Sequence, residues 1–217
     1  MRALVIDSSS AAVVVAVVDV TGTPTALASQ TAVAVHAHGE LLAAAVASCL
    51  ESVGVPPEAV VAGVGPGPFT GLRVGLVSAA AFGYAWCTPT YGVCSLDGIG
   101  AAVPGTVLVA GDARRREVYW AEYVDGVRQG DPAVDRPADV LPRLSRRPPE
   151  AIAGAGARMY ADVFGLPLLD LDYPDPVALA GIAAERIRSA APSETLAPAY
   201  LREPDATPPV LHGAPLV

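Results

Sequence analysis

The segment whose residues are best suited to form a binding site is a glycine- and proline-rich loop between an apolar run and a helix-prone run, Gly65-Pro66-Gly67-Pro68-Phe69-Thr70-Gly71. Free N–H groups at a helix N-terminus can hold an anion there. The GxGxxxG spacing differs from the dinucleotide pattern, and no acidic residue follows about 20 positions later to bind a ribose. Pro66 and Pro68 also lack N–H donors. We therefore expect mainly a tight turn, with Gly67 and Thr70 as candidate nucleotide or anion contacts.

Asp7 is a second candidate, because it ends an apolar run and precedes Ser8-Ser9-Ser10. A carboxylate in this position can hold a hydrated metal ion and phosphates, with Ser9 as a further anion contact. The same pattern is equally typical of an aspartate in a hairpin turn. The sequence leaves both interpretations open.

Other motifs give weaker indications. His36 and His38 are spaced i, i+2 ahead of a helix, which does not converge on a metal as HxxxH does. Arg114-Arg115-Arg116 is typical of a solvated turn, with local RNA contact as the minor alternative. The sequence has no lysine, which excludes Walker-loop and Schiff-base chemistry. It also has no GxSxG elbow, so serine-hydrolase chemistry has no support. We expect no bound metal and no cofactor.

Composition restricts the class of protein further. The net charge of −8 argues against unaided binding of nucleic acid, since that requires a cationic surface. Charge-free apolar stretches fall short of the roughly 20 residues of a membrane span. The three cysteines, Cys49, Cys87 and Cys94, form no CxxC pair and fit a reducing compartment. We therefore expect a cytoplasmic protein without membrane attachment.

Periodicity predicts an α/β protein of two lobes, residues 1–103 and 104–217. Strands are expected at 3–6, 13–18, 31–35, 59–64 and 90–93, with helices at 40–53 and 72–86 and Thr70 as an N-cap. The pattern then restarts: Asp112, like Asp7, ends an apolar strand before a polar turn and a second strand at 117–124. Further helices are expected near 138–144 and 177–189, and a strand near 151–154.

The helices at 40–53 and 72–86 lack the charged outer face of a surface helix. Only Arg73 is charged between Thr70 and Trp86, and Gly71, Gly75, Ala79 and Gly83 recur every four residues. Such a ridge of small residues allows another backbone to approach closely. We predict that the ridge lies outward and receives a partner, so that Gly75→Leu or Ala79→Leu blocks pairing but spares the fold. The alternative is that both helices are sandwiched within the chain.

Five parts of the sequence together resemble the bacterial TsaB (YeaZ) family: 4–10, 38–42, 65–75, 112–114 with 117–119, and Tyr200-Leu201-Arg202. The resemblance covers nearly the whole chain. Pro68 stands where the family usually has serine, and Gly39 where a serine often precedes the glutamate.

The resemblance implies a two-lobed actin/Hsp70/sugar-kinase-like (ribonuclease H-like) fold of mixed sheets with covering helices. It also implies a non-catalytic subunit in threonylcarbamoylation of the tRNA adenosine next to the anticodon. Its partners would be a catalytic TsaD-like paralogue and a TsaE-like ATPase. The chain would form a homodimer when the paralogue is absent, and it would contact tRNA only indirectly, through the complex. The expected interface comprises His38, Glu40, Leu42, Val46, Leu50, Gly71, Leu72, Arg73, Gly75, Ala79, Phe82 and Gly83. The alternative is an ATP-dependent phosphotransferase or peptidase-like enzyme of the same superfamily.

Overall fold

The computed structural model describes residues 1–33, 37–144 and 148–202. His36, His212 and the tail from Pro204 lie outside the described residues. In the described part of the chain, no helix has both the length and the apolar character needed to cross a membrane.

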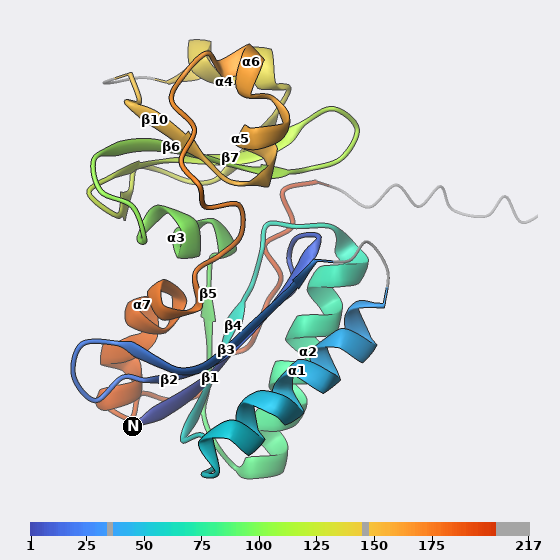
Figure 1. The fold of residues 1–217 in the computed structure, drawn as a ribbon, viewed down its shortest axis with the longest axis vertical. Helices are drawn as coiled ribbons and strands as arrows, with labels where there is room; N and C mark the ends of the chain where they lie inside the picture. The colour runs from blue at the N-terminus through green and yellow to red at the C-terminus, as the bar shows by residue number, and fades with distance from the viewer. Residues whose placement is uncertain (34–36, 145–147, 203–217) are drawn as a thin grey trace, which may run out of the picture.

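The first lobe contains a five-stranded sheet in the order β3-β2-β1-β4-β5 (Figure 1). β1, β2 and β3 pair antiparallel, whereas β4 and β5 run parallel to β1. The bounds are β1 Arg2–Asp7, β2 Ala12–Asp19, β3 Thr25–Val33, β4 Ala59–Gly63 and β5 Thr90–Val93. The predicted order β-β-β-α-β-α-β is confirmed, although β3 begins earlier than expected.

Helices cover both faces of this sheet. α1 (His38–Val53) and α2 (Phe69–Trp86) share one apolar core with the sheet, and α7 (Pro176–Arg188) shares another. α1 ends at Gly54, which adopts the left-handed conformation (φ 70°) that glycine favours after a helix. α2 begins three residues before the predicted start, after Pro68, and Thr70 does not cap it.

The second lobe contains the sheet β10-β6-β7-β8, with β9 also paired to β7. α3 shares a core with one face, and α4, α5 and α6 share a core with the other. The bounds are α3 Ser95–Gly100, β6 Thr106–Asp112, β7 Val118–Val124, β8 Val127–Arg128, β9 Ala133–Asp135, α4 Pro137–Arg143, β10 Ala151–Ala153, α5 Ala155–Met159 and α6 Ala161–Phe164.

The two lobes repeat one arrangement. β1 pairs antiparallel with β2 and parallel with β4, and β6 likewise pairs antiparallel with β7 and parallel with β10. Asp7 and Asp112 are the last residues of β1 and β6. The predicted relationship between the lobes is therefore confirmed by their topology.

The predicted lobe boundary needs one correction. The first sheet ends at Val93 and the second begins at Thr106, which agrees with a division near residue 103. However, Leu179, Ala183 and Ile187 of α7 pack against the first sheet. α7 thus returns to the first lobe and does not belong to the second.

The ridge of small residues on α2 faces the chain's own sheet, so the prediction that it lies outward was wrong. Gly75, Ala79 and Gly83 are buried. A Cβ atom on Gly75 would lie 2.4 Å from Ser8 Oγ, and one on Gly83 would lie 2.4 Å from Thr90 Cγ2. The ridge therefore serves close packing of α2 within the lobe. Because Arg73 is the single charged residue of α2, the sequence pattern contains little indication of which side of the helix faces inward.

We predict that Gly75→Leu destabilises the fold, in contrast to the expectation from sequence. A side chain there collides with the turn after β1, and overpacking of this kind costs about 1–3 kcal/mol or more. Chemical denaturation of the isolated chain measures the loss. Val77→Leu is the matched control, because Val77 lies on the same helix with 68% of its surface exposed. Equal unfolding midpoints for the two variants would contradict the inward orientation.

Candidate functional site

Asp7 is fully buried at the end of β1 and accepts three hydrogen bonds. Oδ1 accepts from the backbone N–H of Ser9 at 2.9 Å and from its hydroxyl at 2.7 Å. Oδ2 accepts from the Ser95 hydroxyl at 2.5 Å, and Ser95 Oγ accepts in turn from Gly65 N at 3.0 Å. The carboxyl group thus connects β1, the turn after it, the glycine loop and α3. Both oxygens are occupied by groups of the chain itself.

Burial raises the pKa of Asp7, because removal from water disfavours the charged form. The hydrogen bonds from Ser95 and Ser9 act in the opposite direction but are outweighed. Gly63 makes room for the carboxyl group, since a Cβ atom there would lie 1.7 Å from Asp7 Oδ2. Of the two interpretations of Asp7, the structure therefore favours the aspartate that organises a turn.

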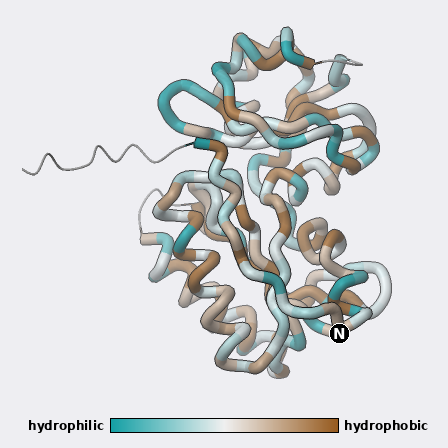
Figure 2. Tube along the Cα trace, turned by 180° about the vertical axis from the view of Figure 1, so that it is seen from behind, coloured by the Kyte–Doolittle hydropathy of each residue, from teal (hydrophilic) through white to brown (hydrophobic). Residues whose placement is uncertain are grey.

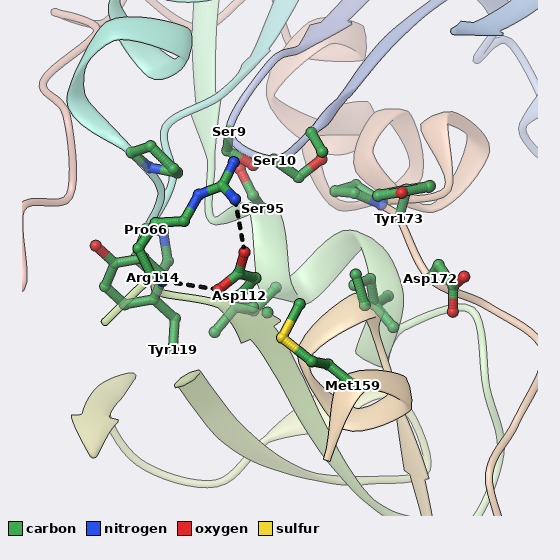
Figure 3. A pocket seen from close by; sticks show the side chains of 17 residues that line it. Ser9, Ser10, Pro66, Ser95, Asp112, Arg114, Tyr119, Met159, Asp172 and Tyr173 are labelled. Atoms are coloured by element: carbon green, nitrogen blue, oxygen red, sulfur yellow. Dashed lines mark hydrogen bonds and ion pairs between the residues drawn. The ribbon is translucent and has the colours of Figure 1, made fainter. Parts of the chain in front are cut away.

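A cavity of about 190 Å³ lies between the lobes (Figure 3). Ser9 and Ser10 line it from the first lobe, and Asp112, Arg114 and Tyr119 line it from the second. Arg114 donates its backbone N–H to Asp112 Oδ1 at 2.7 Å, and its guanidinium lies 3.3 Å from Oδ2. Met159 and Tyr173 add apolar surface. The cavity is smaller than the roughly 300–1,000 Å³ typical of sites for small organic ligands.

The four predicted anion contacts do not form one site. Ser9 lines the cavity, whereas Asp7 lies beneath it and is not among the lining residues. Gly67 packs against the backbone of Ser9, where a Cβ atom would lie 2.1 Å from the carbonyl oxygen. Thr70 is exposed in a separate groove at the start of α2.

That groove lies between the N-terminal ends of α1 and α2, and Arg114 borders it from the second lobe. His38 Nε2 lies 3.1 Å from the carbonyl oxygen of Ser10, so its ring is tied to the turn after β1. In the described part of the chain, no cluster of three or more His, Cys, Asp or Glu side chains could hold a metal ion.

The outer faces of α1 and α2 form a continuous surface with little charge. The two helices lie side by side over the same sheet face, and they are coloured mainly white to brown in Figure 2. Val77 and Tyr84 have 68% and 89% of their surface exposed. The remaining exposed residues of the two helices are the alanines 43, 44, 47, 80, 81 and 85, the uncharged Gly39, Ser52 and Thr70, and the charged Glu40, Glu51 and Arg73.

The predicted interface residues divide between this helix face and the core. The structure buries six of them, which corrects their assignment: Leu42, Val46, Leu72, Gly75, Ala79 and Gly83. They face the sheet because they carry the apolar stripe of each helix. Glu40 and Arg73 are exposed, and His38, Leu50, Gly71 and Phe82 are partly exposed.

A second connection joins Tyr200 to α2. The Arg73 Nε donates to the Tyr200 hydroxyl at 2.8 Å, and the guanidinium lies over the rings of Phe69 and Tyr200. Arg202 then donates to the carbonyl of Ala113 at 2.8 Å and forms an ion pair with Glu117. Residues 200–202 therefore bridge both lobes. These contacts, and the bond from Ser95 to Asp7, join residues too distant in sequence for local patterns to reveal.

Comparison with known structures identifies the class of fold. The chain matches a crystal structure from Pseudomonas aeruginosa described as similar to the peptidase YeaZ, with a TM-score of 0.77 and 27% identity, over 93% of this chain and 99% of that one. It also matches the ethanolamine utilization protein EutJ of Carboxydothermus hydrogenoformans, with a TM-score of 0.55 and 12% identity over 83% and 89% of the two chains, which shows the fold alone. The predicted two-lobed actin/Hsp70/sugar-kinase-like fold is confirmed.

Sequence comparison identifies the family. The family model of TsaD, tRNA N6-adenosine threonylcarbamoyltransferase, matches residues 27–199. The tRNA threonylcarbamoyladenosine biosynthesis protein TsaB of Escherichia coli is 34% identical over 54% of this chain and 56% of that protein. The chain thus belongs to the TsaD family and, within it, to the TsaB (YeaZ) group, as the sequence predicted. A Mycobacterium leprae protein is 44% identical over 99% of this chain, which spans only 58% of that relative.

We predict that Asp7→Asn changes how stability depends on pH. Because the pKa of Asp7 is raised, its neutral form stabilises the fold fully below about pH 3.8, and this contribution is lost as the pH rises through the raised pKa. Asparagine cannot ionise. The stability of wild type relative to the variant should therefore be greatest near pH 4 and decrease toward neutral pH, by about 1.4 kcal/mol for each unit by which the pKa is raised. Thermal unfolding from pH 4 to 8 measures it. If the stabilities of wild type and Asp7→Asn changed with pH in parallel, the prediction of a buried, ionisable Asp7 would be contradicted.

Proposed function

We propose that this chain is a non-catalytic subunit of the complex that transfers a threonylcarbamoyl group to the tRNA adenosine next to the anticodon. It pairs with a TsaD-like catalytic paralogue through the outer faces of α1 and α2. Membership of the TsaB group supports the pathway. The exposed, nearly uncharged helix face carries the proposal of a partner.

Physical reasoning supports this face as the interface. Helices on a sheet normally turn charged residues toward water, yet the exposed positions of α1 between Glu40 and Glu51 are alanines. Alanines let a second helix approach closely, while Val77 and Tyr84 project as larger apolar contacts. Aromatic residues such as Tyr84 are enriched among the strongest contacts of protein interfaces. A helix pair of the paralogue would complete a layer of four helices.

The same face would also form the homodimer that we propose, whereas the remaining partners would join the assembled heterodimer. A homodimer would use one surface on both copies, as two-fold interfaces do, so homodimer and heterodimer exclude each other. The TsaE-like ATPase joins the assembled pair, and tRNA is engaged only in the complex. The net charge of −8 supports this order, because the isolated chain repels a polyanion.

The non-catalytic assignment is supported by the burial of Asp7 and by the small volume of the cavity, about 190 Å³. Asp7 is fully buried, both of its oxygens accept hydrogen bonds from Ser9 and Ser95, and it does not line the cavity where a substrate could bind. The alternative is an ATP-dependent phosphotransferase or peptidase-like enzyme, and the Asp112–Arg114 pair in the cavity is the observation that favours it. Turnover by the isolated chain that Asp112→Asn abolishes would establish this alternative.

We predict that Val77→Glu combined with Ala81→Glu prevents pairing with the TsaD-like protein. Burying two unpaired carboxylates costs several kcal/mol, so the dissociation constant should rise at least about 100-fold. Both positions are exposed in the single chain, so its unfolding midpoint should change little. Light scattering of the mixed proteins measures assembly, and calorimetry measures affinity.

Val127→Glu is the matched control for this experiment. Val127 is 64% exposed on β8 in the second lobe, away from the helix face. The control should assemble as wild type does. Normal assembly by the Val77/Ala81 double variant would refute the proposed interface, whereas failure of wild type itself to assemble would refute the proposed partner.

A further inference from the structure

The turn between β6 and β7 carries three consecutive arginines in a backbone conformation that arginine rarely adopts. The φ angles of Arg114, Arg115 and Arg116 are 60°, 56° and 62°, in the left-handed region. A side chain with a Cβ atom is disfavoured there, and glycine or asparagine usually occupies such positions. Strain of this kind persists at sites where it serves a function. A turn needed only to reverse the chain would not require arginine.

The surrounding structure fixes this turn firmly. Ala113 N donates to the Glu117 carbonyl at 3.1 Å, and Glu117 N donates to the Arg114 carbonyl at 3.0 Å. Arg114 N donates to Asp112, and Arg202 binds both Ala113 and Glu117. The three arginine side chains therefore project from a rigid base, and all three are exposed. Figure 2 shows a hydrophilic loop projecting from the second lobe.

The turn concentrates positive charge in an acidic protein. Arg114, Arg115, Arg116 and Arg202 lie together, with Asp112 paired to Arg114 and Glu117 paired to Arg202. Burial and the nearby charge of Arg115 lower the pKa of Arg202, as expected where guanidinium groups crowd together. Crowded like charges favour binding of a polyanion, which relieves their repulsion.

The turn is also adjacent to the proposed partner interface. Arg114 borders the groove formed by His38, Thr70 and Gly71 at the N-terminal ends of α1 and α2. A polyanion bound at the turn would therefore lie at the edge of the helix face and extend toward the paralogue. This placement suits a long, flexible polyanion better than a single phosphate group.

We propose that Arg115 and Arg116 of this turn bind the phosphate backbone of the substrate tRNA in the assembled complex. This inference rests on the proposed function, and it gives the subunit a direct contact with the RNA, which the sequence indicated only as the minor alternative for this turn. Guanidinium groups bind phosphate oxygens through charge-assisted hydrogen bonds. Such contacts position the RNA without reading its sequence.

The test replaces Arg115 and Arg116 with asparagine in the complex with the TsaD-like protein. Asparagine removes the charge and adopts the left-handed conformation more readily than arginine does, so the turn should be retained. Binding of an unmodified tRNA transcript is then measured as a function of salt concentration. We expect affinity at low salt to fall at least about tenfold, and the salt slope to decrease by about 1 for each phosphate group that the variant no longer neutralises.

Arg136→Ala is the matched control, because Arg136 is exposed on the same lobe at the start of α4. It should leave affinity and slope unchanged. A second variant, Arg116→Glu, reverses one exposed charge and should weaken binding even if the asparagine variant folds poorly.

Each outcome has a distinct meaning. Unchanged tRNA affinity and salt slope in complexes that assemble normally would overturn this inference and leave the proposed function intact. Loss of assembly by the asparagine variant, measured by light scattering, would show that the turn binds an acidic surface of the partner, which also overturns it. Failure of the wild-type protein to assemble with the TsaD-like protein would count against the proposed function. If the isolated chain then bound tRNA and the substitutions abolished that binding, the result would still support the phosphate contact of Arg115 and Arg116.

Discussion

The close approach of α2 and the glycine loop before it to the turn after β1 is the constraint on which the other features depend. Cβ atoms at Gly67, Gly71 and Gly75 would lie 2.1, 2.8 and 2.4 Å from atoms of Ser9 and Ser8. Ser8 Oγ donates to the Gly71 carbonyl at 2.7 Å across the gap. Only glycine allows this approach at three successive positions. This close approach fixes the position of the turn whose Ser9 donates hydrogen bonds to Asp7. It also fixes one wall of the cavity and determines which face of α2 points outward.

Several elements could be predicted because local physics determines them. Gly54 ends α1 where the sequence indicated, and α7 lies within one residue of its predicted bounds at each end. The hairpins that follow Asp7 and Asp112 were predicted from their matching apolar runs. In each case a short stretch of sequence contains the information that sets the structure.

The orientation of α2 could not be predicted, for a physical reason. The periodicity of a helix reveals its buried face because charged residues mark the opposite, solvent-facing side. α2 has only one charged residue, Arg73, so this contrast is nearly absent. Glycine every four residues is compatible with packing on either side. The Ser95 bond to Asp7 and the return of α7 to the first lobe depend on contacts across more than 80 residues, which a single sequence does not display.

The helix face and the arginine turn would bind the partner and the RNA that we propose by different physical means. Contact between apolar helix faces depends on surface removed from water and changes little with salt. Contact between arginine and phosphate weakens steeply as salt increases. Arg202 bonds to the base of the turn, while Tyr200, two residues earlier, contacts Arg73 on α2. Residues 200–202 therefore connect the two surfaces, which would let the proposed partner on the helices and the proposed RNA at the turn be bound at the same time.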